Sequence, residues 1–256
     1  FLCNILHLYE EGEAVVSLSC EGQDVNKGES AGIAGWFESL RNNYPEWDVY
    51  ISNKITDEEY TKGRSFDELA EGINYKIKDD LHLSVSLRSF RSENVSAFVK
   101  ALLDVDKKTA KELYEQFKND YPICITRDIE KAKLWVREKA KGSQRYGITA
   151  SSGAKRLRKY GIWVQNKVDA PNWFLNGKDD VRASYFLEET ATEFDIQGLE
   201  LDWTILCWDA NLRFNDGQFK FFSFKGTKWQ NINKDDNILY LKNAYRVLLT
   251  RARLYK

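Results

Sequence analysis

Short apolar segments alternate with segments of helical periodicity along most of this sequence. Strand-like segments occupy residues 13–19, 47–52, 81–87, 121–126, 146–151 and 203–208. Segments with helical spacing occupy residues 33–40, 92–102, 128–140 and 238–252, and Ser92 and Asp128 are placed to cap two of them. This alternation predicts an α/β fold with a mostly parallel sheet and helices on both of its faces.

In sheets of this kind, ligands bind at the carboxyl ends of the strands. The residues that directly follow the predicted strands are therefore the first candidates for a binding site. They are Gly22, Gln23, Arg88, Arg91, Arg127, Ser151, Ser152 and Gly153.

The composition argues against several classes of protein. With 43% apolar residues and three prolines, the chain has enough apolar side chains for a core. Its apolar runs are too short to cross a bilayer and its first residues do not resemble a signal peptide, so we expect a soluble cytoplasmic protein. Cys3, Cys20, Cys124 and Cys207 lie beside apolar segments, which predicts buried, reduced thiols. With only two histidines, no metal site is expected within the chain.

The net charge of -1 does not suggest a nucleic-acid partner, but the basic residues are unevenly distributed. Ten of them lie between residues 131 and 161, against the single acid Glu138. They occupy positions 131, 133, 137, 139, 141, 145, 155, 156, 158 and 159. Such a run is either a solvated helix face or a surface that follows phosphates, where cations displace condensed counterions.

The usual phosphate-binding motifs do not occur in the sequence. It contains neither GxxxxGK[ST] nor a GxGxxG after a strand, and SSGAKR lacks the order needed to wrap a triphosphate. Asp209, after the segment 203–208, is expected to end that strand rather than to hold a metal. The sequence also lacks methionine, even at position 1, which suggests a fragment of a longer protein.

The last predicted helix ends in an arginine with two possible roles. Helical spacing places Arg251 at the margin of the apolar face, away from the other cations. It is either an arginine that extends from the core edge to water, or an arginine finger that stabilises charge on a transferred phosphoryl group.

The segment TEFDIQGLE also suits a nucleotide. Gly198 allows the backbone to approach a ligand closely. Thr192 and Gln197 offer neutral hydrogen bonds, and Glu200 can accept hydrogen bonds from a ribose hydroxyl. Taken alone, the segment is equally a capped polar turn.

Six segments, taken in order, carry a resemblance to a known family. They are GQDVNKGE, SLRSFRSENVSAFVKALL, YPICITRD, GSQRYGITASSGAKRL, WFLNGKDDVRASYFLEETATEFDIQGLELDW and NAYRVLLTRAR. Together they resemble the Schlafen-group-3-like DNA/RNA helicase family from about residue 14 onward. At greater distance they are similar to the carboxyl-terminal motifs of superfamily 1 helicases of the UvrD and Rep type.

This resemblance implies roles for individual residues. TEFDIQGLE is similar to motif V, although Gln197 stands where those helicases usually have lysine. SFRSENVSAF is similar to motif IV, which implies that Arg91 approaches the terminal phosphate. RVLLTRAR is similar to motif VI, which implies that Arg251 is the arginine finger. EGQDVN is similar to the end of motif III, which implies that Gln23 links the nucleotide to the nucleic-acid site.

The family also implies an ATP-driven motor of two RecA-like lobes, with ATP and Mg²⁺ between them. On this basis residues 1–41 end the first lobe, 42–80 form an insertion or linker, and 81–256 form the second lobe. The phosphate-loop lysine and the Mg²⁺ ligands are expected upstream of this chain, in a partner domain or region. The chain alone is therefore expected to hydrolyse ATP poorly.

Nucleic acid, single-stranded or duplex, is the expected partner. Its expected contacts are Ser151, Ser152, Lys155, Arg156 and Arg158, with Trp173 and Trp229 as weaker candidates for base stacking. One rival function is a RecA-like module that binds nucleic acid without ATP turnover. Another is a metal-dependent nuclease. Its acids would come from Glu188, Glu189, Glu193, Asp195, Glu200 and Asp202.

Overall fold

The computed structural model describes residues 32–56, 65–81, 90–196 and 199–252. The chain divides into two compact units, Phe1–Leu87 and Arg88–Lys256. Both units combine helices with parallel strands, which confirms the α/β class. The expected strand at 13–19 and most of the one at 81–87 lie outside the described residues. The division into a lobe end, an insertion and a second lobe stays a prediction.

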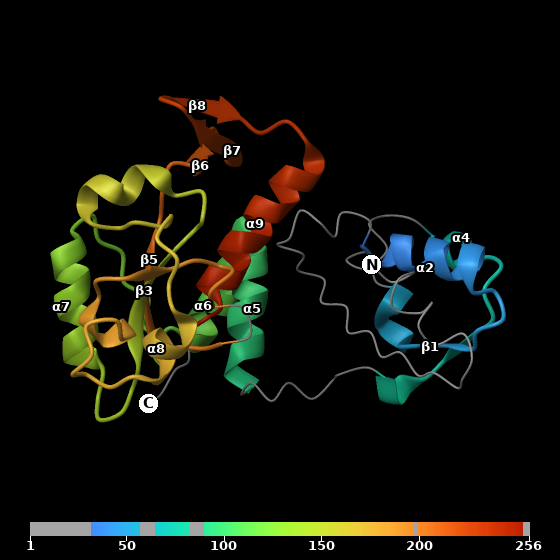
Figure 1. The fold of residues 1–256 in the computed structure, drawn as a ribbon, viewed down its shortest axis with the longest axis horizontal. Helices are drawn as coiled ribbons and strands as arrows, with labels where there is room; N and C mark the ends of the chain where they lie inside the picture. Colours follow the sequence, from blue (N-terminus) through green and yellow to red (C-terminus); the bar gives the residue numbers. More distant parts are fainter. Residues whose placement is uncertain (1–31, 57–64, 82–89, 197–198, 253–256) are drawn as a thin grey trace. The chain divides into compact units, whose positions relative to one another are not determined.

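The first unit contains a pair of parallel strands, and Figure 1 labels one of them, β1. The described elements are α2 (Gly32–Asn43), β1 (Val49–Ile51), the 3-10 helix η3 (Asn53–Thr56), α4 (Phe66–Ala70), β2 (Tyr75–Ile77) and the 3-10 helix η4 (Asp79–Leu81). Phe37, Ile51 and Leu69 are buried together, so α2, β1 and α4 share one core. The helix expected at 33–40 and the strand expected at 47–52 are confirmed by α2 and β1.

The second unit contains a three-stranded parallel sheet with the order β4–β3–β5. Its strands are β4 (Thr190–Ala191), β3 (Tyr146–Ala150) and β5 (Trp203–Cys207). Side chains alternate along β3, so Ile148 packs in one core cluster with Val136, while Gly147 on the other face meets Trp173. Val136 belongs to α7 (Ile129–Lys139) and Trp173 to α8 (Ala170–Leu175). Helices therefore cover both faces of β3, as expected.

Helix α7 begins where the sequence predicts. The side chain of Asp128 accepts hydrogen bonds from the N–H groups of Glu130 and Lys131, at 3.0 and 3.2 Å. These bonds satisfy two of the donors that a helix leaves unpaired at its start. The helix expected at 128–140 is confirmed by α7. The strands expected at 146–151 and 203–208 are confirmed by β3 and β5.

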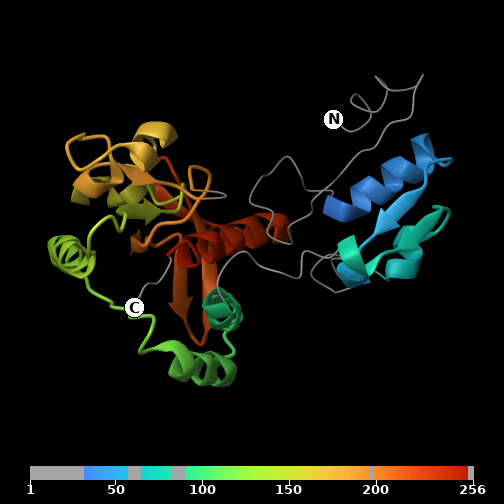
Figure 2. The same ribbon diagram turned by 90° about the horizontal axis from the view of Figure 1, so that it is seen from below.

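Helices α5 (Phe90–Leu103), α6 (Lys107–Phe117) and α9 (Asp235–Leu249) share a second core. Phe98 and Phe117 meet edge to face at 5.3 Å, and Tyr245 of α9 is fully buried in the same core. Figure 2 shows α9 in red with the green helix α5 beside it. Ser92 was expected to cap the helix at 92–102, but α5 begins at Phe90 and Ser92 lies inside it, so that expectation is wrong. Among the described helices, none is long and apolar enough to span a membrane.

An antiparallel meander, which the periodicity did not reveal, follows β5 (Figure 1). Its strands are β6 (Leu212–Asn215), β7 (Gln218–Lys225) and β8 (Lys228–Asn231), in that order. Asp216 and Gly217 connect β6 to β7 with φ values of 51° and 80°. This left-handed pair is the two-residue hairpin turn that Asp-Gly favours. The expectation of a parallel sheet therefore holds for the pair β1–β2 and for the sheet β4–β3–β5, but not for the meander.

The strand expected at 121–126 is wrong. Pro122 lacks an N–H group, and no strand within the described ranges pairs with this segment. Ile125 is 94% exposed, and Cys124 is exposed rather than buried as expected. Cys207, by contrast, is buried as expected, and burial raises the pKa of its thiol to about 12. Cys3 and Cys20 lie outside the described residues.

Candidate functional site

Three loops meet at the carboxyl edge of the central sheet. The register of β3 with β4 and with β5 brings the ends of the three strands side by side. The loops that follow begin at Ser151, Thr192 and Trp208. Because ligands bind at this edge of parallel sheets, the side chains of these loops define the candidate site.

Glu193, the second residue after β4, is a buried carboxylate that holds the loop after β3. It is 3% exposed, and its two oxygens accept hydrogen bonds from the N–H group and the hydroxyl of Ser152, at 2.8 and 2.7 Å. Burial raises the pKa of Glu193, although the bonds from Ser152 favour its charged form. Ser152, expected to contact nucleic acid, thus uses both of its donors inside the protein.

Ser151 belongs to a chain of buried hydrogen bonds between the loops and α9. It is 1% exposed, and its hydroxyl oxygen accepts a hydrogen bond from the side-chain amide of Asn211 at 3.1 Å. The hydroxyl of Tyr245 donates to the amide oxygen of Asn211 at 2.6 Å. Asp209 lies two residues past the end of β5, and its carboxylate accepts a hydrogen bond from the N–H group of Arg156 at 3.3 Å. These bonds fix the positions of the loops after β3 and β5 relative to each other.

Asp195 closes the loop after β4. Its carboxylate accepts hydrogen bonds from the N–H group and the hydroxyl of Thr192, at 2.8 and 2.7 Å. The hydroxyl hydrogen of Thr192 is therefore directed into the loop, and this residue is only 6% exposed. Glu200 is partly buried farther along the chain. Gln197 and Gly198 lie outside the described residues.

Arg251 lies beyond α9, next to the end of this same loop. Because α9 ends at Leu249, the helical face that spacing assigned to Arg251 is wrong. The carbonyl oxygen of Arg251 accepts a hydrogen bond from the N–H group of Leu201 at 2.9 Å, and Leu201 forms a parallel bridge with Ala252. At 3% exposure, Arg251 does not extend from the core edge into water. The fold therefore joins the segment around Arg251 to the residue that follows TEFDIQGLE.

The other two residues expected to act in catalysis are less fully described. Arg91 lies in the first turn of α5, and later residues of this helix share a core with α9. The side chain of Arg91 lies outside the described part of the chain, as does all of Gln23. Their assigned roles stay predictions.

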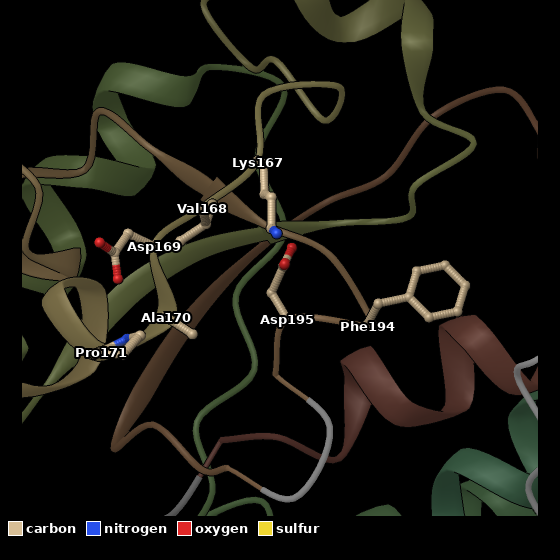
Figure 3. A pocket seen from close by; sticks show the side chains of 7 residues that line it. All are labelled: Lys167, Val168, Asp169, Ala170, Pro171, Phe194 and Asp195. Carbon is tan, nitrogen blue, oxygen red and sulfur yellow. The ribbon is translucent and has the colours of Figure 1, made fainter.

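A pocket of about 570 Å³ opens beside the loop after β4 (Figure 3). It is lined by Lys167, Val168, Asp169, Ala170, Pro171, Phe194 and Asp195. The side chains of Lys167 and Asp195 point toward each other in Figure 3, while the ring of Phe194 points away from them. Since Asp195 also binds Thr192, it belongs both to the lining of the pocket and to the loop after β4.

The basic run between residues 131 and 161 divides into two parts. On α7, Lys131 and Lys133 form ion pairs with Asp128 and Glu130, as on an ordinary solvated helix face. Arg145 turns inward, where its guanidinium donates hydrogen bonds to two carbonyl oxygens and to a serine hydroxyl. These three residues of the first part are therefore bound within the protein.

The second part of the run is the 3-10 helix η5 (Lys155–Tyr160), which follows β3. Lys155, Arg156 and Arg158 are all exposed there. Arg156 lies over the ring of Phe224 at 5.1 Å, and Arg158 over the ring of Trp163 at 4.2 Å. These cations remain accessible to an anionic partner at the edge of the site.

Nearly the whole chain matches one known protein family. The family described as "Schlafen group 3, DNA/RNA helicase domain" matches residues 3–254. The chain belongs to this family. No curated protein and no solved structure matches it. The resemblance carried by the six sequence segments is thus confirmed, and a helicase-like domain is consistent with binding to nucleic acid in general.

Sequence patterns missed much of what positions the site of this Schlafen group 3 domain. They did not single out Asn211 or Tyr245, and they considered Glu193 only as a nuclease acid. The available signal was position, because Glu193 lies two residues past the end of β4 and Asn211 directly precedes β6. Trp173 is fully buried in the core, so its suggested stacking role is wrong, whereas Trp229 is partly exposed.

Three of the acids considered for a nuclease hold the backbone of the Schlafen group 3 domain in place. Glu193 and Asp195 bind neighbouring loop groups, and Asp202 accepts a hydrogen bond from the N–H group of Arg145 at 2.6 Å. Over the residues that the structure describes, no three His, Cys, Asp or Glu side chains are grouped to hold a metal ion. The edge of the sheet instead offers fixed loops, a buried arginine and exposed cations.

Proposed function

We propose that this domain is the arginine-bearing, RecA-like second lobe of a nucleic-acid-dependent ATPase, a helicase or translocase. The observation that carries the proposal is the main-chain bond between Leu201 and Arg251. It holds the arginine of the segment similar to motif VI beside the loop similar to motif V. Membership of a helicase-like family supports the same reading.

The residues at this edge suit one side of a nucleotide. In the proposal, Glu200 accepts hydrogen bonds from the ribose, Gly198 allows close approach, and Arg251 meets the charge on the phosphates, with Arg91 and Gln197 nearby. Bound ATP with Mg²⁺ would supply the phosphoryl group that is transferred. Because the sequence has no GxxxxGK[ST] loop, the phosphates and Mg²⁺ would be held by another part of the whole protein.

Thr192 has a different role in the proposal from the one that its position suggests. Asp195 uses both donors of Thr192, so Thr192 shapes the loop instead of donating to the nucleotide. The exposed cations Lys155, Arg156 and Arg158 would contact the phosphates of nucleic acid. Ser151 and Ser152 form hydrogen bonds within the protein, so they would hold η5 in position rather than contact the nucleic acid themselves.

A second candidate function is a module that binds nucleic acid without ATP turnover. Gln197, which stands in place of the usual lysine, favours it, as do the exposed arginines of η5. The two functions share the nucleic-acid surface and differ only in hydrolysis. ATP turnover by the whole protein therefore separates them.

The test is ATP hydrolysis by the whole protein with and without single-stranded DNA or RNA. We expect nucleic acid to stimulate turnover and Arg251→Ala to reduce stimulated turnover by roughly a thousandfold, as for an arginine finger. Arg251→Lys keeps the charge without the planar fork and should recover only part of the rate. Arg182→Ala is the matched control, because Arg182 is exposed and pairs with Asp180.

Two results would contradict the proposal. If the whole protein binds nucleic acid but shows no stimulated hydrolysis, the binding module is correct. If turnover is stimulated but Arg251→Lys and Arg251→Ala both keep it, Arg251 is a packing residue. Because Arg251 is buried, thermal unfolding and nucleic-acid binding of each variant must match those of the unchanged protein.

A further inference from the structure

We propose that one face of the meander β6–β7–β8 binds single-stranded nucleic acid and extends the surface that begins at η5. This inference rests on the proposed function, because it names a further part of the path of nucleic acid across the domain. The surface consists of Arg213, Phe222, Phe224 and Trp229, and we name it the Arg213 face.

The register of the meander places these side chains together. Positions 220, 222 and 224 of β7 share one face because side chains alternate along a strand. Arg213 is in register with position 220, and Trp229 with position 224. Phe221 points the other way and packs against the core of α5, α6 and α9. The Arg213 face is therefore the side of the meander that this core does not use.

Arg213 is held in position on this face. Its guanidinium lies over the ring of Phe222 at 4.1 Å and over the ring of Trp229 at 5.0 Å. Its Nε group donates a hydrogen bond to the carbonyl oxygen of Ala210 at 2.6 Å. A guanidinium supported in this way is a platform on which a base can stack, and its two terminal nitrogens can bind phosphate oxygens.

The Arg213 face continues into η5. The rings of Phe224 and Trp229 meet at 5.2 Å, and Arg156 of η5 lies over the ring of Phe224 at 5.1 Å. Arg156 and Arg213 therefore lie over neighbouring rings. The result is a continuous surface in which cations and aromatic rings alternate, the arrangement that single-strand-binding proteins use.

The charges on this surface call for an anionic partner. In the described part of the chain, none of Arg156, Arg158 and Arg213 forms an ion pair with a carboxylate. Lys220, which is in register with Arg213, forms an ion pair with Asp216 of the hairpin turn. A single strand exposes both phosphates and base faces, whereas a duplex hides the base faces within its stack. Rings and unpaired arginines together thus favour a single strand.

The test is the affinity of the whole protein for a fluorescently labelled 20-nucleotide oligo(dT) and oligo(rU), measured by anisotropy over a range of salt concentrations. Arg213→Gln should weaken binding at least about fivefold and lower the slope of log affinity against log salt by about 0.7, the value for one phosphate contact on a single strand. Arg213→Lys should leave the slope unchanged but still weaken binding, because lysine cannot replace the planar platform.

Lys228→Gln is the matched control. Lys228 is exposed on the opposite face of the meander, where it is in register with Lys225, so losing its charge should change neither affinity nor slope. The inference is overturned if both Arg213 variants bind like the unchanged protein, or if Lys228→Gln has the same effect as Arg213→Gln. If the unchanged protein binds neither oligonucleotide, the proposed function itself fails. If it binds both and the Arg213 variants lose affinity while ATP hydrolysis is absent, the inference stands and the motor proposal fails.

Discussion

The carboxylate of Glu193 binds both the N–H group and the hydroxyl of Ser152, and so ties the loop after β4 to the loop after β3. Both residues lie at the edge of the sheet where the candidate site is found. The pair sets the shape of the backbone from which η5, with its exposed arginines, begins. Its contribution to stability can be measured directly.

Replacing Glu193 separates its hydrogen bonds from its charge. Glu193→Ala removes both acceptors and should lower the free energy of unfolding by about 1 to 3 kcal/mol. Glu193→Gln can still accept from the N–H group and donate to the hydroxyl, so it should stay close to the unchanged chain at neutral pH. Urea unfolding of the chain and its variants measures both effects. Equal stability of the Ala and Gln variants would show that the hydrogen bonds do not contribute.

The raised pKa of Glu193 predicts a dependence of stability on pH. Burial keeps a proton on Glu193 in the folded chain above the ordinary value of 4.5, at a pH where the unfolded chain has lost it. The contribution of this group to stability should therefore fall as pH rises from about 4.5 to the raised pKa and stay constant above it. Glu193→Gln removes this contribution, so the stability difference between the two chains should follow the same curve. A difference independent of pH would contradict the prediction.

Gly147 has no room for a side chain. A Cβ atom at this position would lie 2.6 and 2.7 Å from two ring carbons of Trp173, which is fully buried. Gly147→Ala should therefore destabilise the chain by about 1 to 3 kcal/mol. In a double-mutant cycle, Trp173→Phe should recover part of that loss, because the smaller ring makes room for the methyl group. Purely additive losses would show that the two positions are not in contact.

The hydroxyl of Tyr245 is the donor that satisfies Asn211. Tyr245→Phe leaves the buried amide oxygen of Asn211 without this donor and should cost about 1 to 3 kcal/mol. Tyr121→Phe is a suitable control. Tyr121 is also buried, which raises its pKa to about 12, but its hydroxyl forms no hydrogen bond to the described residues. Equal losses in thermal or urea unfolding for the two variants would contradict a special role for the bond to Asn211.

Local sequence signals predicted those elements whose stabilising contacts are themselves local. Helix α7 was predictable because Asp128 caps it and its apolar residues recur at helical spacing. The segment 121–126 has similar local signals for a strand, but a strand needs a neighbour and none pairs with it in the described structure. The meander was missed although Asp216 and Gly217 are a strong turn signal, because its aromatic residues occur on both faces and hide the alternation.

The candidate site was predictable in outline only. Its place at the ends of parallel strands followed from the α/β pattern, and Ser151 was found in this way, whereas Thr192 was singled out from the segment TEFDIQGLE. The hydrogen bonds from Glu193 to Ser152 and from Tyr245 to Asn211 join residues far apart in sequence. Which polar groups become buried together depends on tertiary packing, and no periodicity along the chain encodes it. The helical face predicted for Arg251 was wrong for the same reason, since the surroundings of Arg251 are set by its contact with Leu201 and not by the helix before it.

The bridge between Leu201 and Ala252 has a consequence for how the protein is made. These two residues are separated in sequence by β5, the whole meander and α9. During synthesis on the ribosome, the residue at the end of the loop after β4 therefore lacks its main-chain partner until the segment after α9 has left the exit tunnel. We expect the nascent domain to pass through a stage in which this loop is still unpaired, the kind of stage at which chaperones bind and aggregation competes with folding.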